Sequence, residues 1–183
     1  DGVFAECKAL KNVVMQEGVT EIGLFTFQEC SALSTVTIPN SVKNIKVGVF
    51  DRCVGLTNIT VGKGNLEYSS VNGVLFDKKK TMLILYPKAK KGAYKIPNGV
   101  TSIESEAFKQ SSGLTSVTIP GSLKRIEAGA FGACFGLKSV TISEGVEVID
   151  YKAFYGCVEL ASVTIPNSVS VIGSSAFEYC KSL

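Results

Sequence analysis

A 23-residue internal repeat constrains the fold of this chain more than any other feature. Phenylalanine marks the repeat at Phe4, Phe27 and Phe50, and a second series with the same 23-residue step begins at Phe108. The second series is Phe108, Phe131, Phe154 and Phe177. A repeat of this length is typical of a solenoid, because one such unit cannot bury its apolar face alone and must stack on its neighbours. The sequence therefore predicts a stacked array of coils with a continuous core.

The consensus repeat unit reads A-F-x-x-C-x-x-L-x-S-V-T-I-P-x-S-V-x-x-I-x-x-x. The alternation in S-V-T-I-P predicts a short strand with Val and Ile inward and Ser and Thr outward, ended by Pro, which cannot donate to a sheet. V-x-x-I suits a second short extended segment. The spacing in A-F-x-x-C-x-x-L is that of one helical turn, so it predicts a single-turn or 3-10 helix. The expected coil is mostly β.

This pattern resembles the BspA-type leucine-rich repeats, and the resemblance covers essentially the whole chain. It is plainest in two coils. These are Ala130-Phe131 with Cys134, Leu137, Val140 and Ile142, and Ala153-Phe154 with Cys157, Leu160, Val163, Ile165 and Pro166. The resemblance implies an α/β leucine-rich-repeat solenoid. It also implies a surface or secreted protein, since members come from host-associated microbes and several are regarded as adhesins.

The repeat is interrupted once, between Phe50 and Phe108, where twelve residues are extra. Residues 74–76 and 82–86 are strand-like and flank a polar connection, so we expect a β-hairpin in a variant coil at about 62–97. Residues 1–183 otherwise form one solenoid domain. The chain starts and stops inside a repeat without polar caps. We therefore expect either that it is trimmed at both ends or that its apolar ends are buried by self-association.

The sequence argues against an enzyme. It has no His, which excludes Ser-His-Asp and Cys-His catalysis, and it shows no phosphate-binding loop and no distinctive carboxylate pair. We therefore expect no catalytic residue and no cofactor.

The six Cys all follow a repeat Phe by three residues, which places them inward as free thiols. Disulfides between stacked coils are the alternative, although ladders of three cannot pair completely. Without a C-x-x-C pair we expect no metal site.

The outward strand positions carry a stripe of hydroxyl side chains. Its predicted binding residues are Thr35, Thr37, Thr60, Thr118, Thr141 and Thr164. Two interpretations stay open: a solvated strand face selected for β-propensity, or a flat hydrogen-bonding platform for a protein or glycan. An ice-binding array is disfavoured, because most rows read Ser-x-Thr and the variant coil breaks the stripe.

Positive charge concentrates in residues 77–95, which hold seven Lys and one Asp, although the whole chain is only +3. The candidate binding residues in this segment are Lys78, Lys79, Lys80, Tyr86, Lys88, Lys90 and Lys91. One interpretation is a hairpin edge that lysines protect against edge-to-edge pairing. The other is a site for an acidic protein or glycan. Nucleic acid is disfavoured because the cluster lacks Arg.

Together these features predict a non-enzymatic protein-binding module of a cell-surface or secreted, adhesin-like protein that contacts host matrix proteins or other cells. Glycan is a second partner class. The alternative is a self-assembly module that forms homo-oligomers through its ends or hairpin. No apolar run is long enough for a membrane span. The expected location is extracellular or the cell surface, with the periplasm as the alternative. A specific site is expected first at the break in the repeat.

Overall fold

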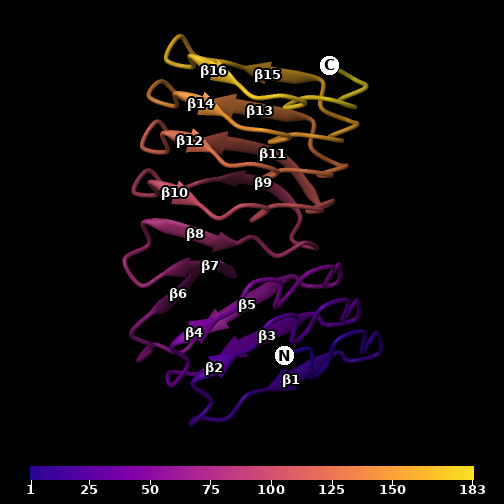
Figure 1. The fold of residues 1–183 in the computed structure, drawn as a ribbon, viewed down its shortest axis with the longest axis vertical. Coiled ribbons are helices and arrows are strands. Elements are labelled where there is room, and N and C mark those ends of the chain that lie inside the picture. The colour runs from indigo at the N-terminus through magenta and orange to yellow at the C-terminus, as the bar shows by residue number, and fades with distance from the viewer.

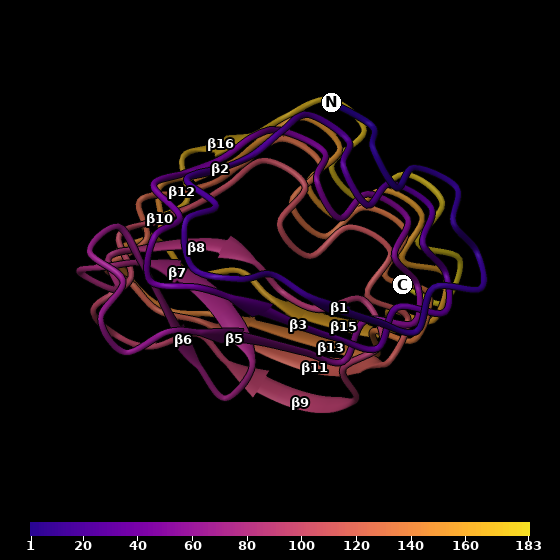
Figure 2. The same ribbon diagram turned by 90° about the horizontal axis from the view of Figure 1, so that it is seen from below.

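The computed structural model describes all 183 residues, which stack as coils along one long axis with the two termini near opposite ends (Figure 1). Seen along that axis, the coils superimpose as a flattened, roughly three-sided outline (Figure 2). The chain contains sixteen short strands and no helix. Accordingly, no helix is long and apolar enough to cross a bilayer.

One wall, which we call the strand face, is made by the S-V-T-I segments. It consists of β1 (Asn12–Val14), β3 (Thr35–Ile38) and β5 (Asn58–Val61) in one sheet, and β9 (Gly92–Lys95), β11 (Leu114–Ile119), β13 (Ser139–Ile142) and β15 (Ser162–Thr164) in another. Pairing is parallel and usually offset by one repeat, as in Val36 beside Ile59. In β3 the Thr side chains are exposed and Val36 and Ile38 are buried, so the predicted alternation is observed.

A second wall is made by the V-x-x-I segments, which form two-residue strands. These are β2 (Glu21–Ile22), β4 (Asn44–Ile45), β10 (Ser102–Ile103), β12 (Arg125–Ile126), β14 (Val148–Ile149) and β16 (Val171–Ile172). β2 pairs with β4, and β12, β14 and β16 form a separate parallel sheet. This wall is therefore divided at the same level as the strand face.

The third wall, which we call the turn wall, contains the A-F-x-x-C-x-x-L segments, and the single-turn helix predicted there does not form. Left-handed residues flank the repeat Phe on both sides, as at Phe25 (φ 54°) and Glu29 (φ 60°) around Phe27. A helix needs a run of negative φ angles, so these residues force consecutive turns instead. The turns direct amide groups at the next coil, as where Phe27 N donates to Val49 O at 3.0 Å.

The core is a stack of identical side chains along the axis. Rings of the repeat Phe lie nearly parallel, for example Phe131 and Phe154 with centroids 5.0 Å apart. The six cysteines are unpaired, and five of their thiols donate to the carbonyl of the Phe 26 residues earlier, as Cys53 Sγ does to Phe27 O at 3.0 Å. Each coil thus bonds to its neighbour through its interior as well as its walls.

The extra residues form an antiparallel meander where the sequence predicts a hairpin. It consists of β6 (Tyr68–Val71), β7 (Val74–Asp77) and β8 (Met82–Leu85), and β8 then pairs in parallel with β10. The meander does not protrude, because Leu75, Phe76 and Leu83 are fully buried. It separates two apolar clusters, of 14 residues on the N-terminal side and 27 on the C-terminal side. The solenoid is therefore two stacked blocks joined by the meander.

Candidate functional site

The strand face presents the predicted Thr stripe in two blocks. Thr35, Thr37, Thr60, Thr141 and Thr164 are exposed, whereas Thr118 is half-buried. Among these hydroxyls only that of Thr60 has a hydrogen-bond partner within the protein, and it accepts from the side-chain Nδ2 of Asn58 at 3.1 Å. The others are free to bond to an external partner.

The meander divides this stripe. The turn between β6 and β7 lies against β5, where Ile59 N donates to Gly73 O at 3.0 Å. β5 therefore does not pair with β9, the first strand of the C-terminal sheet. The sequence anticipated the break in the stripe but not which strands would border it.

The basic segment does not fold into one patch. Lys78, Lys79 and Lys80 are exposed in the turn before β8, and Lys90 and Lys91 follow the opposite end of that strand (Figure 1). Lys78 Nζ also donates to the carbonyl of Asn65. The structure thus provides two small basic groups, one on each side of the molecule.

Two residues of the predicted basic site are buried. Tyr86 is 1% exposed and occupies the Phe position of its coil, with its ring 4.9 Å from that of Phe108. Lys88 is 4% exposed, and its Nζ donates to Lys109 O at 2.8 Å. Burial lowers the pKa of Lys88, while the nearby Asp51 carboxylate acts in the opposite direction. One sequence signal for Tyr86 exists: it precedes Phe108 by 22 residues, nearly one repeat.

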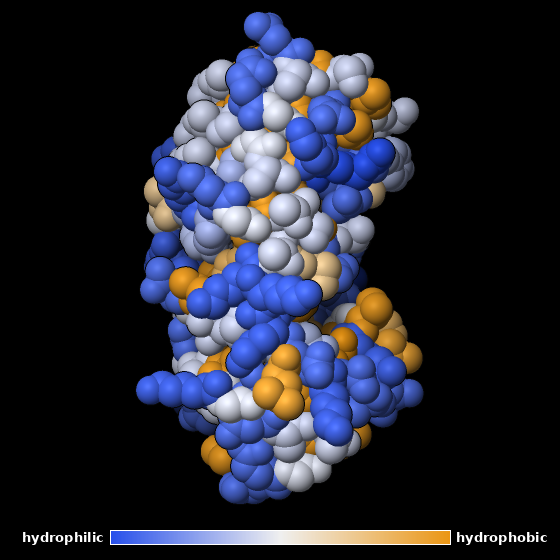
Figure 3. All heavy atoms as spheres, turned by 90° about the vertical axis from the view of Figure 1, so that its left-hand side faces the viewer, coloured by the Kyte–Doolittle hydropathy of each residue, from blue (hydrophilic) through white to orange (hydrophobic).

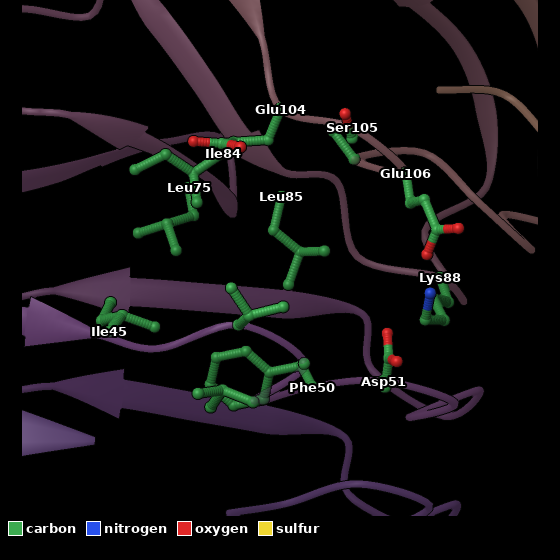
Figure 4. A pocket seen from close by; sticks show the side chains of 14 residues that line it. Ile45, Phe50, Asp51, Leu75, Ile84, Leu85, Lys88, Glu104, Ser105 and Glu106 are labelled. Atoms are coloured by element: carbon green, nitrogen blue, oxygen red, sulfur yellow. The ribbon is translucent and has the colours of Figure 1, made fainter. Parts of the chain in front are cut away.

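A groove opens in the turn wall at the break between the two blocks. Its apolar part is lined by Val49, Phe50, Leu75, Ile84 and Leu85. Figure 4 shows Leu75, Leu85 and Phe50 around this space, with Lys88 and Asp51 facing each other at one end. In Figure 3 the outline is hollowed at about mid-height, with apolar atoms gathered beside the hollow.

The groove exists because one set of coil-to-coil hydrogen bonds is missing from the turn wall. We call the series of such bonds along this wall the turn-wall ladder. Phe4, Phe27, Phe108, Phe131 and Phe154 each donate their amide to a carbonyl of the following coil, at 2.8 to 3.0 Å. The Phe50 amide has no partner, and neither do the amides of Gly48 and Arg52 on either side of it. From Phe50 to Tyr86 the chain is thirteen residues longer than one repeat. These extra residues form the meander, which fills the core but not this part of the wall.

The two lips of the groove differ in chemistry. The N-terminal lip is apolar, with Val47 78% exposed. The C-terminal lip carries Glu104 and Glu106. Glu106 pairs with Lys109 at 2.6 Å, but no cation lies within ion-pair distance of Glu104. The sequence located the break but not these residues, because residue types do not reveal which main-chain amides lack a hydrogen-bond partner.

No group of three or more His, Cys, Asp or Glu side chains is arranged to hold a metal ion. The arrangement instead offers free hydroxyls on one wall, and free amides, an apolar floor and a carboxylate on another. These are the groups used in hydrogen-bonded recognition of another macromolecule.

A family model for the BspA type leucine rich repeat region matches residues 1–81 and 88–183, with six copies. No curated protein matches the chain.

Several solved structures share the fold. The pneumococcal vaccine antigen PcpA superimposes with a TM-score of 0.77 and 27% identity, over 90% of this chain and 47% of that one. A leucine rich cell surface protein from Faecalibacterium prausnitzii A2-165 gives 0.69 and 29%, over 100% of this chain and 61% of that one. The T. pallidum leucine rich repeat protein gives 0.63 and 26%, over 94% and 77%. The chain thus spans 47% of the length of the first and 61% of the length of the second.

Proposed function

Because the chain belongs to the BspA-type leucine-rich repeat family, we propose that it is a non-enzymatic protein-binding module of a cell-surface or secreted protein. Its role would be adhesin-like, toward host matrix proteins or other cells, with glycan as a second partner class. A related fold occurs in a protein described as a leucine rich cell surface protein, which supports this location.

The observation that carries the proposal is the state of the strand face. Five exposed Thr side chains lie on parallel strands in fixed register, and four of their hydroxyls have no partner within the protein. A rigid ladder of free hydroxyls loses little conformational entropy when a partner binds. The exposed lysines beside β8 would add attraction for an acidic partner.

Binding to a panel of purified extracellular matrix proteins, measured by surface plasmon resonance with a parallel glycan array, tests the proposal. Two double variants place charge on the two blocks: T37K/T60K and T141K/T164K. T101K is the matched control, because Thr101 is exposed outside the strand face. We expect at least one double variant to lose binding while T101K retains it.

Equal binding by both double variants and the wild type would exclude the strand face. K78Q/K79Q/K80Q and K90Q/K91Q, assayed separately, measure the contribution of each basic group. Self-assembly is the competing function. It predicts stable oligomers by light scattering and no binding to any member of the panel.

A further inference from the structure

The vacant step in the turn-wall ladder is a site with defined hydrogen-bonding requirements. Within each block, the acceptors are carbonyls of alternate residues, such as those of Leu24, Thr26 and Gln28, which receive the amides of Gly2, Phe4 and Glu6. The corresponding amides of Gly48, Phe50 and Arg52 have no acceptor, although Phe50 is only 4% exposed. A buried amide without a partner costs about 1–3 kcal/mol, so an occupant that supplies carbonyls is favoured there.

The spacing of these donors identifies the occupant as polypeptide main chain. The amides belong to every second residue, and their equivalents elsewhere bond to carbonyls two residues apart. An extended peptide presents carbonyls of alternate residues along one edge. This is the recognition mode in which a peptide adds to an open hydrogen-bonding edge and side-chain pockets supply specificity.

The side chains around the vacant step indicate which peptide fits. Leu75, Ile84 and Leu85 line the floor, so one row of peptide side chains should be apolar. Glu104 is exposed on the lip without an ion pair, whereas Asp51, which also lines the groove, already faces Lys88. The alternate row, which points the opposite way in an extended chain, should therefore be basic.

We propose that the groove between the two blocks binds an extended peptide segment of a partner protein, with alternating apolar and basic residues, through the free amides of Gly48, Phe50 and Arg52. This inference rests on the proposed protein-binding function and assigns it a second site, distinct from the strand face. The partner segment takes the place that a coil occupies elsewhere in the solenoid.

The test uses the whole chain and a fluorescein-labelled acetyl-Lys-Val-Lys-Val-Lys-Val-amide peptide, with the Glu-Val counterpart as the charge-reversed control. S105Y should block the groove, since Ser105 lines it three residues before Phe108. The fold accepts Tyr at this position, because Tyr151 stands three residues before Phe154 and is 48% exposed. A128Y places the same side chain one coil further on and is the matched control.

Fluorescence polarisation should show binding of the Lys-Val peptide to the wild type and to A128Y. In S105Y the blocked groove prevents the peptide from forming the three hydrogen bonds to the free amides. Binding to this variant should therefore be about 100-fold weaker. Removal of a partly desolvated charge pair in E104Q should weaken it roughly tenfold. Amide exchange by NMR should slow at residues 48, 50 and 52 when the peptide is bound.

Several results would overturn the inference: no peptide binding, equal binding to S105Y and A128Y, or unchanged exchange at the three amides. A dimer of the wild type that S105Y dissociates would also overturn it, since a second copy would then fill the groove. If the peptide fails but matrix binding remains sensitive to T37K/T60K or T141K/T164K, the strand-face function stands and only this inference fails.

Discussion

At the scale of single residues, the repeat accounts for the position of most side chains, and the exceptions are residues that depart from it. The only buried side-chain polar atoms without a hydrogen-bond partner are Tyr86 Oη and Ser111 Oγ. Both stand where other coils have a different residue: Tyr86 in the position of a repeat Phe, and Ser111 in the position of a Cys. Both belong to coils next to the break.

Replacing Tyr86 by Phe should stabilise the protein by about 1 kcal/mol, because it removes a buried hydroxyl without a partner and leaves the ring stack intact. Burial already raises the pKa of Tyr86 to about 12. Urea denaturation measures the change. F131Y, which introduces a hydroxyl into the uninterrupted part of the stack, is the converse control and should destabilise. A destabilised Y86F would mean that its hydroxyl has a partner, such as an ordered water.

The buried thiol of Cys53 gives stability a pH dependence. Burial raises its pKa from 9.0 to about 12. Above pH 9 the unfolded chain releases this proton while the folded chain retains it, so stability should fall as the pH rises from 9 to 12. Denaturation at intervals from pH 8 to 11 measures this. C53A, whatever its cost at pH 8, should show a shallower decline. Parallel curves for the two proteins would contradict the assignment.

At the scale of elements, the meander depends on one side chain in the turn between β7 and β8, whose role the sequence pattern does not indicate. The Asp77 carboxylate accepts from Thr81 Oγ1 at 2.9 Å and from Met82 N at 2.8 Å, which closes the turn between β7 and β8. The three lysines of that turn remain exposed. One side chain therefore holds the turn between two of the three strands that fill the break.

Replacing Asp77 by Ala should lower the free energy of unfolding by about 1–2 kcal/mol, because it removes two hydrogen bonds, one of which caps a turn amide. Thermal and urea unfolding measure the loss. K79A changes an exposed residue of the same turn and should stay within about 0.5 kcal/mol of the wild type. Similar losses in the two variants would show that the turn, and not the carboxylate, matters.

Strands were the elements that sequence reasoning predicted best, because burial on one face leaves a two-residue alternation, as in Thr35 to Ile38. It failed in the turn wall, where apolar spacing suggested a helical turn. The deciding feature there is the left-handed conformation of residues such as Phe25, Glu29 and Arg52. Phe, Glu and Arg have no preference for positive φ, so stacking on the next coil must impose this conformation. The burial of Tyr86 and Lys88 likewise depends on how the variant coil resumes the register.

At the scale of the whole molecule, the meander divides the core unequally. The C-terminal cluster has 27 buried residues and the N-terminal cluster 14. Stability in a solenoid is roughly the sum of its repeats and their interfaces. The two blocks should therefore differ in stability, with the N-terminal block the weaker.

Native-state hydrogen exchange over a urea series should show residues 12–61 opening at a lower free energy than residues 114–164, in two cooperative units. V36A and V140A remove equivalent side chains from the two blocks. V36A should lower only the free energy of opening of residues 12–61. V140A should lower that of residues 114–164 and leave exchange in the first block unchanged. A single free energy for all protected amides would show that the meander couples the blocks into one unit.

The break in the turn-wall ladder also has a mechanical consequence. Elsewhere on that wall, amide-to-carbonyl bonds run along the long axis from coil to coil, but near the break only the bond from Ala89 N to Leu56 O, at 2.8 Å, crosses it. At this level an axial pulling force would be shared on this wall by fewer hydrogen bonds than elsewhere. We expect the molecule to extend first by hinging open there, so that tension along the axis would widen the groove before it unravelled either block.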